Sequence, residues 1–469
     1  MKQFWASFFG ALGGIVAAAG LALLAAVFLA GDVVTSTVRS APAVRSESPV
    51  VLEIDLRAAQ PAGPSRSALA LALDHAAADP RIEAVFVRAA PALDPAFAAE
   101  LHAALARLSD AGKPVGAHAQ GFAGPLAGGY AAVSGADRLW LQSTARFDVE
   151  TPASPRGAGI SLHDQALRRL AADRGITVDS AGAALARAPL TAEAALEAGL
   201  ADSVGQVWDA RAESLAATEG GVVVSMTEYA AQIRGGSRPT LIALIDAQGA
   251  LEATADPVTA ALEDAVRAEN VRAAVLRLDS PGGSVTGAEE IHGAVLRARR
   301  AGLPVVVSIA GAATEAGYVA AVAADRIVAS PASLVAVMAP PAGVGISAEP
   351  VGAPGEEASR ALHAARFEQA RYAQVLDLIA AGRDLPPARI EALSAGRVWT
   401  GAQALDLGLV DRTGGLAAAV EEARTLAGLT SDEAVSVTPF PTGSAPLERW
   451  RTAVSLISAP QPPAEQARP

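Results

Sequence analysis

Two short segments of this sequence carry residues that could do chemistry. The first, Asp279-Ser280-Pro281-Gly282-Gly283-Ser284, follows an apolar run and is followed within a few residues by the start of a helical pattern. Paired glycines after a strand let the backbone approach a ligand closely, with N–H groups pointing outward. Such donors can form an oxyanion hole for acyl transfer. A tight strand-to-helix turn without any ligand explains the same residues equally well.

The second segment, Ala310 to Tyr318, follows the next apolar run and precedes another helix. It places Glu315 where a strand passes into a helix. A hydroxyl nucleophile needs a neighbouring base, so the other candidates for chemistry are hydroxyl groups and imidazoles. These are Thr314, Ser280, Ser284 and Ser308 as hydroxyl groups, and His118, His102 and His292 as bases. A turn or packing role is the alternative for each of them.

Composition excludes several classes of site. The chain has no cysteine, and its six histidines form no HExxH motif, so we expect no thiol nucleophile, no metal and no cofactor. The net charge of −12 argues against a nucleic-acid partner, which requires a basic face. Lysine occurs only as Lys2 and Lys113. Arginine stays protonated at working pH, so a neutral amine base must be one of these two, and Lys113, just before a strand, is interpreted as structural.

The elements that must position these residues occur twice. Glu100-Leu101-His102 is repeated as Glu290-Ile291-His292, and residues 111–115 are repeated as 301–305 at the same offset. Further matches follow in the same order, which indicates an internal duplication. Each half alternates short apolar strands with helices, the pattern of a parallel sheet covered on both faces. We expect strands at 50–56, 84–88, 114–119, 240–245, 273–278 and 305–309, and helices at 67–78, 97–111, 257–268 and 288–301.

The N-terminal run from Phe4 to Ala30 has no charged residue and is long enough to cross a bilayer. It exceeds the usual h-region of a cleaved signal peptide. We therefore expect an uncleaved signal anchor, with a cleaved signal peptide as the alternative. Lys2 before the run favours an N-in, single-pass orientation weakly, which places the body on the extracytoplasmic (periplasmic) side of the membrane.

The order of strand, SPGGS, helix, PVVVS, small-residue loop, Gly317-Tyr318 and ADRIVASP resembles the signal peptide peptidase A family, also called protease IV. The N-terminal span and the duplication are similar as well. The resemblance implies two tandem ClpP/crotonase-like repeats after a transmembrane helix, a serine nucleophile from the second repeat and a lysine base from the first. It also implies a ring-like, tetramer-like oligomer that degrades signal-peptide remnants.

The resemblance maps both catalytic positions onto residues that cannot do the family's chemistry. The serine expected three residues before Tyr318 is Glu315, and the lysine, aligned through Pro189 and Leu190, falls on Ala184. The backbone of Gly282 and Gly283 is retained as an oxyanion-type element. A carboxylate at the nucleophile position would repel the oxyanion, and both members of a coupled pair are missing.

These observations predict a membrane-anchored pseudoenzyme that binds peptides or assembles with itself or with an active paralogue. An active serine-type endopeptidase with a rearranged site is one alternative, and a crotonase-like acid/base enzyme using Glu315 is another. The expected domains are an anchor (1–32), a tether (33–48), a first repeat (49–219), a linker (220–237), a second repeat (238–430) and a Pro-rich tail (431–469).

Overall fold

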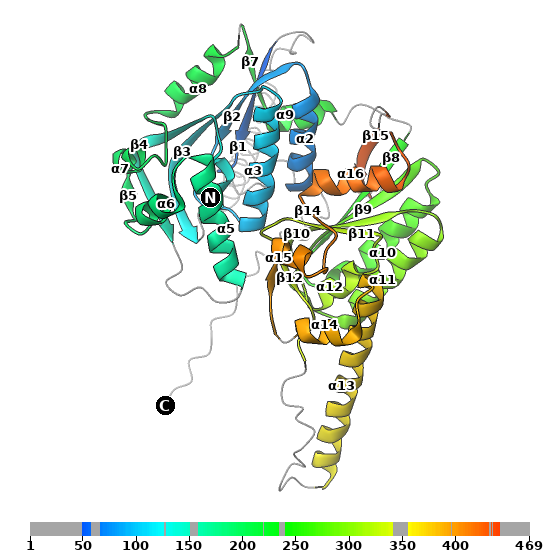
Figure 1. Cartoon of the computed structure of the whole chain (residues 1–469). Helices are drawn as coiled ribbons and strands as arrows, with labels where there is room; N and C mark the ends of the chain where they lie inside the picture. The colour runs from blue at the N-terminus through cyan, green and yellow to red at the C-terminus, as the bar shows by residue number, and fades with distance from the viewer. Residues whose placement is uncertain are drawn as a thin grey trace, which may run out of the picture.

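The computed structural model is a mixed α/β structure built on two mainly parallel sheets (Figure 1). It describes residues 49–57, 66–125, 128–150, 158–218, 220–233, 240–340, 355–394, 396–430, 433 and 435–440. The expected anchor and tether, including Phe4 to Ala30, lie outside these residues. Within the described ranges, no helix is both long and apolar enough to cross a membrane.

The first sheet has seven strands, and only the β4–β5 pair is antiparallel. In spatial order its strands are β5 (Leu190–Thr191), β4 (Arg138–Glu150), β3 (Val115–Pro125), β2 (Ile82–Arg88), β1 (Val50–Asp55) and β7 (Val222–Ser225), with β6 (Ser203–Val204) beside β4.

The second sheet has eight strands, and only the β12–β13 pair is antiparallel. In spatial order its strands are β13 (Trp399–Thr400), β12 (Leu334–Ala336), β10 (Val305–Thr314), β9 (Val271–Ser280), β8 (Thr240–Gln248) and β15 (Val435–Pro439), with β11 (Arg326–Ala329) beside β10 and β14 (Arg412–Thr413) beside β11.

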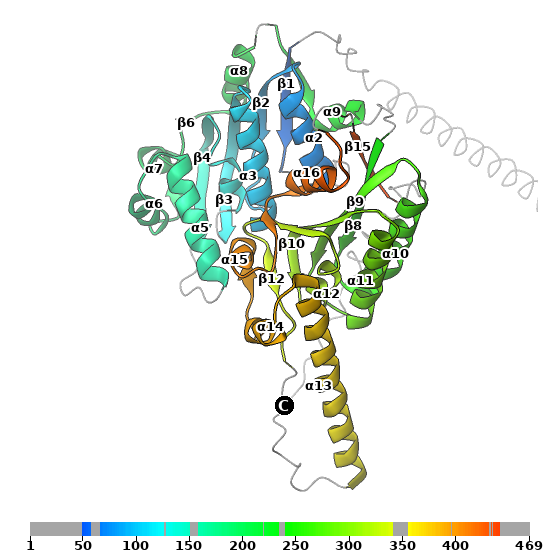
Figure 2. The same cartoon turned by 45° about the vertical axis from the view of Figure 1, so that its right-hand side comes forward.

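The helices form three layers around the two sheets (Figures 1 and 2). The outer face of the first sheet is covered by α8 (Val207–Ala216), and its other face by α2 (Arg66–Ala78), α3 (Pro95–Asp110), α4 (Gly128–Val133) and α9 (Met226–Ile233). The second sheet meets α2 and α16 (Leu416–Leu426) on one face, and α10 (Leu251–Arg267), α11 (Val285–Arg300) and α12 (Ala316–Ala321) on the other. The remaining helices are α5 (Ala158–Asp173), α6 (Val178–Leu185), α7 (Ala192–Glu197), α13 (Gly355–Arg383), α14 (Pro387–Ser394) and α15 (Gly401–Asp406).

The helix α3 shows how the sequence sets an element boundary. Asp94 is its N-cap, and the carboxylate accepts hydrogen bonds from the N–H groups of Ala96 and Phe97, at 3.1 and 3.0 Å. Pro95 occupies the first helical position, where its missing N–H costs nothing. The helix therefore begins at Pro95, two residues before the expected start.

Three elements differ from the expectations. The helix expected from Pro257 begins at Leu251, and Pro257 lies inside it on the exposed side, where a carbonyl without a helical partner can face solvent. Residues within the expected linker form β7 and α9, and β7 extends the first sheet beside β1. Part of the expected tail forms β15, which pairs with β8. In all three cases, packing against a neighbouring element determines the structure more strongly than the local sequence does.

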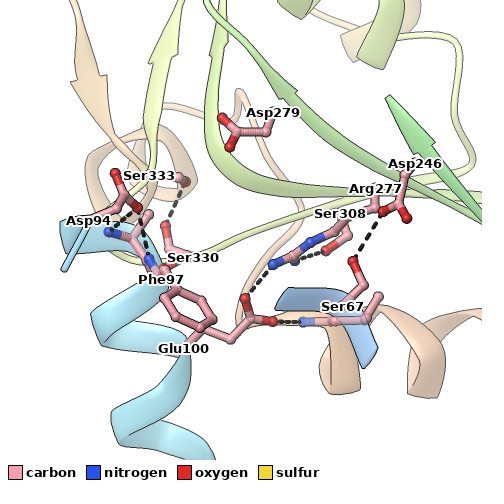
Figure 3. A network of polar contacts seen from close by, with 12 residues as sticks. Ser67, Asp94, Phe97, Glu100, Asp246, Arg277, Asp279, Ser308, Ser330 and Ser333 are labelled. Carbon is pink, nitrogen blue, oxygen red and sulfur yellow. Dashed lines mark hydrogen bonds and ion pairs between the residues drawn. The ribbon is translucent and has the colours of Figure 1, made fainter. Parts of the chain in front are cut away.

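A buried polar network joins the two halves of the chain (Figure 3). The Arg277 guanidinium, on β9, donates to the carboxylate of Glu100, on α3, and to Ser308 Oγ at 2.7 Å. The other Glu100 oxygen accepts the N–H of Leu416, at the start of α16, at 2.5 Å. The Arg277 and Glu100 side chains are only 3% and 6% exposed. Because the pair is buried away from water, removing either side chain would leave the other charge buried without its partner.

A second link in this network connects α2 to β8. Ser67 Oγ donates to Asp246 Oδ1 at 3.0 Å. Burial raises the pKa of the Asp246 carboxyl, and the Ser67 hydrogen bond and the Arg277 charge partly offset this increase. The two links place the second sheet directly against the helices of the first half. The candidate site lies on the same strands, β9 and β10.

Candidate active site

The loop after β9 holds the paired glycines in a conformation that few other residues adopt. Gly282 and Gly283 have φ values of 119° and 114°, a region that side chains disfavour. The Gly282 N–H donates to Ser280 Oγ at 3.2 Å, and the Ser280 hydroxyl donates back to the Gly282 carbonyl at 3.1 Å. The Gly282 amide is thus engaged within its own loop, which leaves Gly283 as the better-placed donor for a ligand.

Glu315 occupies a strained turn between β10 and α12. Its φ of 51° and ψ of −115° make it one of two non-glycine residues with positive φ in the described part of the chain. Its N–H donates to the Ala336 carbonyl of β12 at 3.0 Å, and its carbonyl accepts the Tyr318 N–H at 3.1 Å. Strand-to-helix turns of this strained type expose a nucleophile in hydrolases. Here the turn exposes a carboxylate.

The helix that follows Glu315 is fixed by buried contacts. Tyr318 is fully buried, and its hydroxyl donates to the Leu409 carbonyl at 2.6 Å. Gly317 lies so close to β9 that a Cβ atom there would come 3.0 Å from the Ser280 carbonyl. Thr314 Oγ1 donates to the Pro281 carbonyl at 2.7 Å. These contacts hold the Glu315 turn and the glycine loop together.

Two carboxylates flank the glycine loop. A Cβ atom at Gly282 would lie 3.8 Å from Glu315 Oε2, and a Cβ atom at Gly283 would overlap the Glu252 carboxylate. Glu252 is an exposed residue in the first turn of α10. Sequence reasoning missed it because the helix was expected to begin later, at Pro257, and no local signal ties Glu252 to the loop. Two negative charges beside these amides oppose the binding of an oxyanion.

The other hydroxyl and imidazole candidates serve the fold. Ser280 and Ser308 are buried, and Ser284 caps α11 by accepting the Gly287 N–H at 3.2 Å. His102 Nε2 is 2.9 Å from Asp173 Oδ2, and His292 Nδ1 is 3.1 Å from the Val319 carbonyl. His118 Nε2 is 3.3 Å from the Gly205 carbonyl, and burial lowers the pKa of this imidazole. None of these hydroxyl groups is hydrogen-bonded to one of these histidines among the described contacts.

Lys113 is held by the end of a helix. Its Nζ donates to the carbonyls of Ala76 and Asp79, at 2.7 and 2.5 Å, and burial lowers the pKa of its ammonium group. The side chain lies in the first half and is almost fully enclosed. These contacts support the structural interpretation of Lys113. Lys2 lies outside the described residues.

Asp79, in the same cluster, makes the stability depend on pH. Hydrogen bonds from the Arg81 side chain lower the pKa of Asp79 to about 2. A lowered pKa contributes stability that is present above the unfolded pKa of about 3.9 and is lost as pH falls toward the folded value. Between pH 4 and pH 2 the free energy of unfolding should fall by up to about 2 kcal/mol from this group. Urea titrations of the chain and of Asp79→Asn check this, since the variant should lack that part of the slope.

Ala184 belongs to the first half of the chain, whereas Glu315 belongs to the second. It is on α6, is 3% exposed and belongs to the apolar core of the first sheet. No described contact joins it to Glu315, Gly282 or Gly283. A lysine at this position would have to bury its ammonium group or displace its neighbours. The assignment of the family's lysine position to Ala184 stays a prediction.

Relieving the strain at Glu315 should stabilise the chain. Glu315→Gly removes the cost of holding a side chain at positive φ, and we expect a gain of about 1 kcal/mol in the free energy of unfolding. Asp384→Gly is a matched control, because Asp384, the residue directly after the end of α13, has the same φ of 51°. Denaturant midpoints measure both. A loss of stability in Glu315→Gly alone would show that the carboxylate itself holds the loop.

The described residues contain no group of three or more His, Cys, Asp or Glu side chains arranged to hold a metal ion. What the site offers chemically is therefore a backbone amide at Gly283 beside the carboxylates of Glu315 and Glu252. This arrangement can bind a polar or cationic group, and the described hydrogen bonds of the Thr314 and Ser280 hydroxyl groups go to backbone carbonyls.

Comparison with known proteins finds similar sequences over part of the chain. Residues 355–430, which run from α13 to just beyond α16, match the model of peptidase family S49. Protease 4 of Salmonella typhi is 34% identical over 193 residues, which cover 37% of this chain and 31% of that protein. Protease 4 of Haemophilus influenzae is 27% identical over 224 residues, covering 42% of this chain and 36% of that protein.

Two further proteins match part of the chain. The chloroplastic serine protease SPPA of Arabidopsis thaliana is 28% identical over 187 residues, or 35% of this chain and 28% of that protein. The structure of a ClpP1 mutant from Listeria monocytogenes matches 36% of this chain and 90% of its own at 18% identity, and its TM-score of 0.29 is too low to support an argument. The matched region spans about a third of the curated relatives. The sequence matches nevertheless agree with one another: this chain is similar to peptidase family S49 at residues 355–430, and to the proteins named protease 4 and SPPA over 35–42% of its length.

Proposed function

We propose that this chain is a non-catalytic, membrane-anchored member of the family that binds peptides without cleaving them. The observation that carries the proposal is the exposed Glu315 carboxylate, which stands in a nucleophile-type turn directly over Gly282. A serine in this turn would need a base to accept its proton. The relatives are named as proteases, which supports peptides as the ligands of this chain.

We also propose that the chain is a tandem pair of ClpP/crotonase-like repeats. In the first sheet, β1 lies between the edge strand β7 and β2, and β3 and β4 follow. In the second sheet, β8 lies in the same way between the edge strand β15 and β9, and β10 and then β11 and β12 follow. The core residues of α2 and α10, and those of α3 and α11, also match at near-constant offsets. These correspondences support the duplication proposed from sequence.

Membrane attachment belongs to the same proposal. The uncharged run Phe4 to Ala30 supports a single-pass anchor, and Lys2 before it supports an N-in orientation with the body outside the cytoplasm. Protease protection in sealed inverted vesicles tests the orientation. The body should be protected inside such vesicles and become sensitive when detergent opens them.

Peptide binding without turnover is the direct test of the function. The full chain, purified in detergent, should bind fluorescently labelled cleaved signal peptides, and mass spectrometry should recover those peptides intact. Gly283→Val should weaken binding by at least tenfold, because the added side chain fills the position beside Glu252. Gly302→Val is a matched control at a positive-φ glycine with nothing near its Cβ position. Cleaved peptides, or equal binding by both variants, would refute the proposal.

A crotonase-like acid/base enzyme is a second candidate. The exposed Glu315 carboxylate next to the glycine loop is a geometry in which a carboxyl group could exchange a proton with a bound acyl compound. Isothermal titration of acyl-thioesters tests it. Binding that is lost in Glu315→Gln would favour this candidate, and the absence of binding would end it.

A further inference from the structure

Three segments of the chain must come together to form the candidate site. Glu252 follows β8, the paired glycines follow β9, and Glu315 follows β10. These neighbouring parallel strands bring the three segments to one edge of the second sheet. They do not fix how the three loops pack against one another. Contacts between the loops therefore decide how Gly283 is presented to a ligand.

Asp279, near the end of β9, is bonded to the segments on both sides of the glycine loop. Its backbone carbonyl accepts the Gly249 N–H, in the loop between β8 and α10, at 2.9 Å. Its Oδ1 atom accepts the Ala312 N–H, on β10, at 3.0 Å. Three residues further along the chain, the Gly282 carbonyl accepts the Leu251 N–H at 3.3 Å. The backbone and the side chain of this aspartate thus connect all three segments.

The Asp279 carboxylate supports an irregular part of β10. The register between β10 and β9 shifts between Ile309 and Ala313, so the regular ladder of backbone hydrogen bonds is interrupted there. The carboxylate accepts the Ala312 N–H inside this stretch. Glycine at position 311 permits the approach, because a Cβ atom on Gly311 would lie 2.5 Å from Asp279 Oδ1. The strained turn of the candidate site follows directly after this stretch.

The network that joins the two halves does not involve this carboxylate. In Figure 3, Asp279 lies apart from the chain of contacts through Arg277 and Glu100, and no hydrogen bond or ion pair connects it to the other residues drawn. Its side chain is half-buried. The contacts of Asp279 are therefore those of the loops that form the candidate site.

The first half of the chain provides an internal comparison. Arg88 occupies the place of Arg277, since each is paired with the aspartate of the preceding strand. The second residue after Arg277 is Asp279, whereas the second residue after Arg88 is Ala90. The first half therefore has no carboxylate at this position.

The loop of the first half that follows this position lies against the start of α4. A Cβ atom on Gly128 would lie 2.0 Å from the Leu93 carbonyl oxygen, and one on Gly129 would lie 2.3 Å from the Ala90 carbonyl oxygen. In the second half, Ala316 takes the place of Gly128, and its methyl group excludes the same closed form. Loss of the Asp279 contact should therefore loosen the glycine loop rather than close it.

We infer that Asp279 is the positioning residue of the candidate site. Its hydrogen bond to β10 fixes the glycine loop and the Glu315 turn relative to each other, so that Gly283 is presented to a ligand. That the ligand is a peptide rests on the proposed function, whereas the positioning role does not. A loop that visits several conformations binds its ligand more weakly, in proportion to the time it spends in the competent one.

Two variants break the contact from opposite sides. Asp279→Ala removes the acceptor, and Gly311→Ala displaces the carboxylate with a methyl group. Each should weaken the binding of labelled signal peptides to the full chain by about tenfold or more, because hydrogen bonds to charged groups are strong. The double variant should bind no more weakly than either single variant, since both act through one contact. Additive losses would overturn the inference.

Asp279→Asn distinguishes hydrogen bonding from charge. The amide oxygen can still accept the Ala312 N–H, so this variant should bind peptides within about threefold of the wild type. Asp325→Ala is a matched control, because Asp325 Oδ2 accepts the Val305 N–H at 2.9 Å at the other end of β10. It should lower stability and leave peptide binding unchanged. Binding as weak in Asp279→Asn as in Asp279→Ala, or equal losses in Asp279→Ala and Asp325→Ala, would contradict the positioning role.

Hydrogen exchange tests the positioning role without any ligand. Asp279→Ala and Gly311→Ala should speed exchange at residues 249–251, where two N–H groups are bonded to carbonyls of β9 and the glycine loop. Asp279→Asn and Asp325→Ala should leave these rates unchanged. Wild-type exchange rates in Asp279→Ala would refute the inference even if peptides bind. A wild-type chain that binds no peptide would refute the proposed function instead, and faster exchange in Asp279→Ala would still support the positioning role.

Discussion

Replacing Arg277 with methionine should lower the free energy of unfolding by about 3–5 kcal/mol. The substitution leaves the Glu100 carboxylate buried between the two halves with its main positive partner gone. Ser308 Oγ also loses the donor that lies 2.7 Å away in the native structure. Among the described contacts of Glu100, the hydrogen bond from the Leu416 N–H remains. Equilibrium unfolding in urea, followed by circular dichroism, measures the change.

The double variant distinguishes two contributions to the free energy of unfolding: the cost of a buried charge without a partner, and the net stabilisation by the ion pair. Glu100→Leu combined with Arg277→Met removes both charges, and it should recover at least half of the lost stability. Arg267→Met is the matched control, because that arginine pairs with Asp264 at 2.8 Å on the exposed surface of α10. Its expected effect is too small to shift the denaturation midpoint measurably, because solvent screens this exposed pair. A loss below about 1 kcal/mol in Arg277→Met would show that the network does not hold the halves together.

Glu315→Ser should leave the chain without peptidase activity, even though it places a serine in the nucleophile-type turn. A serine hydroxyl needs a base, and the described candidates are engaged elsewhere: Lys113 with two carbonyls and His102 with Asp173. Removing a nucleophile and base that act together costs about a millionfold in turnover. Restoring one of them should therefore stay within about tenfold of background, measured with a fluorogenic peptide.

Adding Ala184→Lys to Glu315→Ser tests where the family's lysine belongs in this chain. Turnover in the double variant would support Ala184 as that position. A folded but inactive double variant would contradict it. The melting temperature must be measured in parallel, because Ala184 is part of the first core and an ammonium group there carries a large desolvation cost.

The alternation of strands and helices could be predicted because it depends on local apolar runs. The expected strands at 273–278 and 305–309 lie inside β9 and β10, and the expected helices at 97–111 and 288–301 correspond to α3 and α11. The start of α10, the edge strand β7 and the edge strand β15 could not be predicted this way. They are short or interrupted by proline, and they form because β1, β8 and α11 offer them a packing surface.

Some residues of the candidate site could likewise be predicted from the sequence, and others could not. The glycine loop and Glu315 follow consecutive strands of a parallel sheet, so their proximity follows from the sequence order. Glu252 joins them only because α10 begins earlier than Pro257. The Glu100–Arg277 pair depends on how the two halves stack, and nothing local to either residue indicates it.

If this chain lacks a hydroxyl group activated by a base, as proposed above, a serine-directed probe should not label it. Treatment of the full wild-type chain with a fluorophosphonate probe, followed by mass spectrometry of the intact protein, tests it most directly. Protease 4 of Salmonella typhi serves as the positive control for a named protease of the family. We expect the probe to leave the wild-type chain unlabelled while the control gains one adduct. Stoichiometric labelling of a single hydroxyl in the native chain, with peptide cleavage that disappears when that residue is replaced by alanine, would contradict the account.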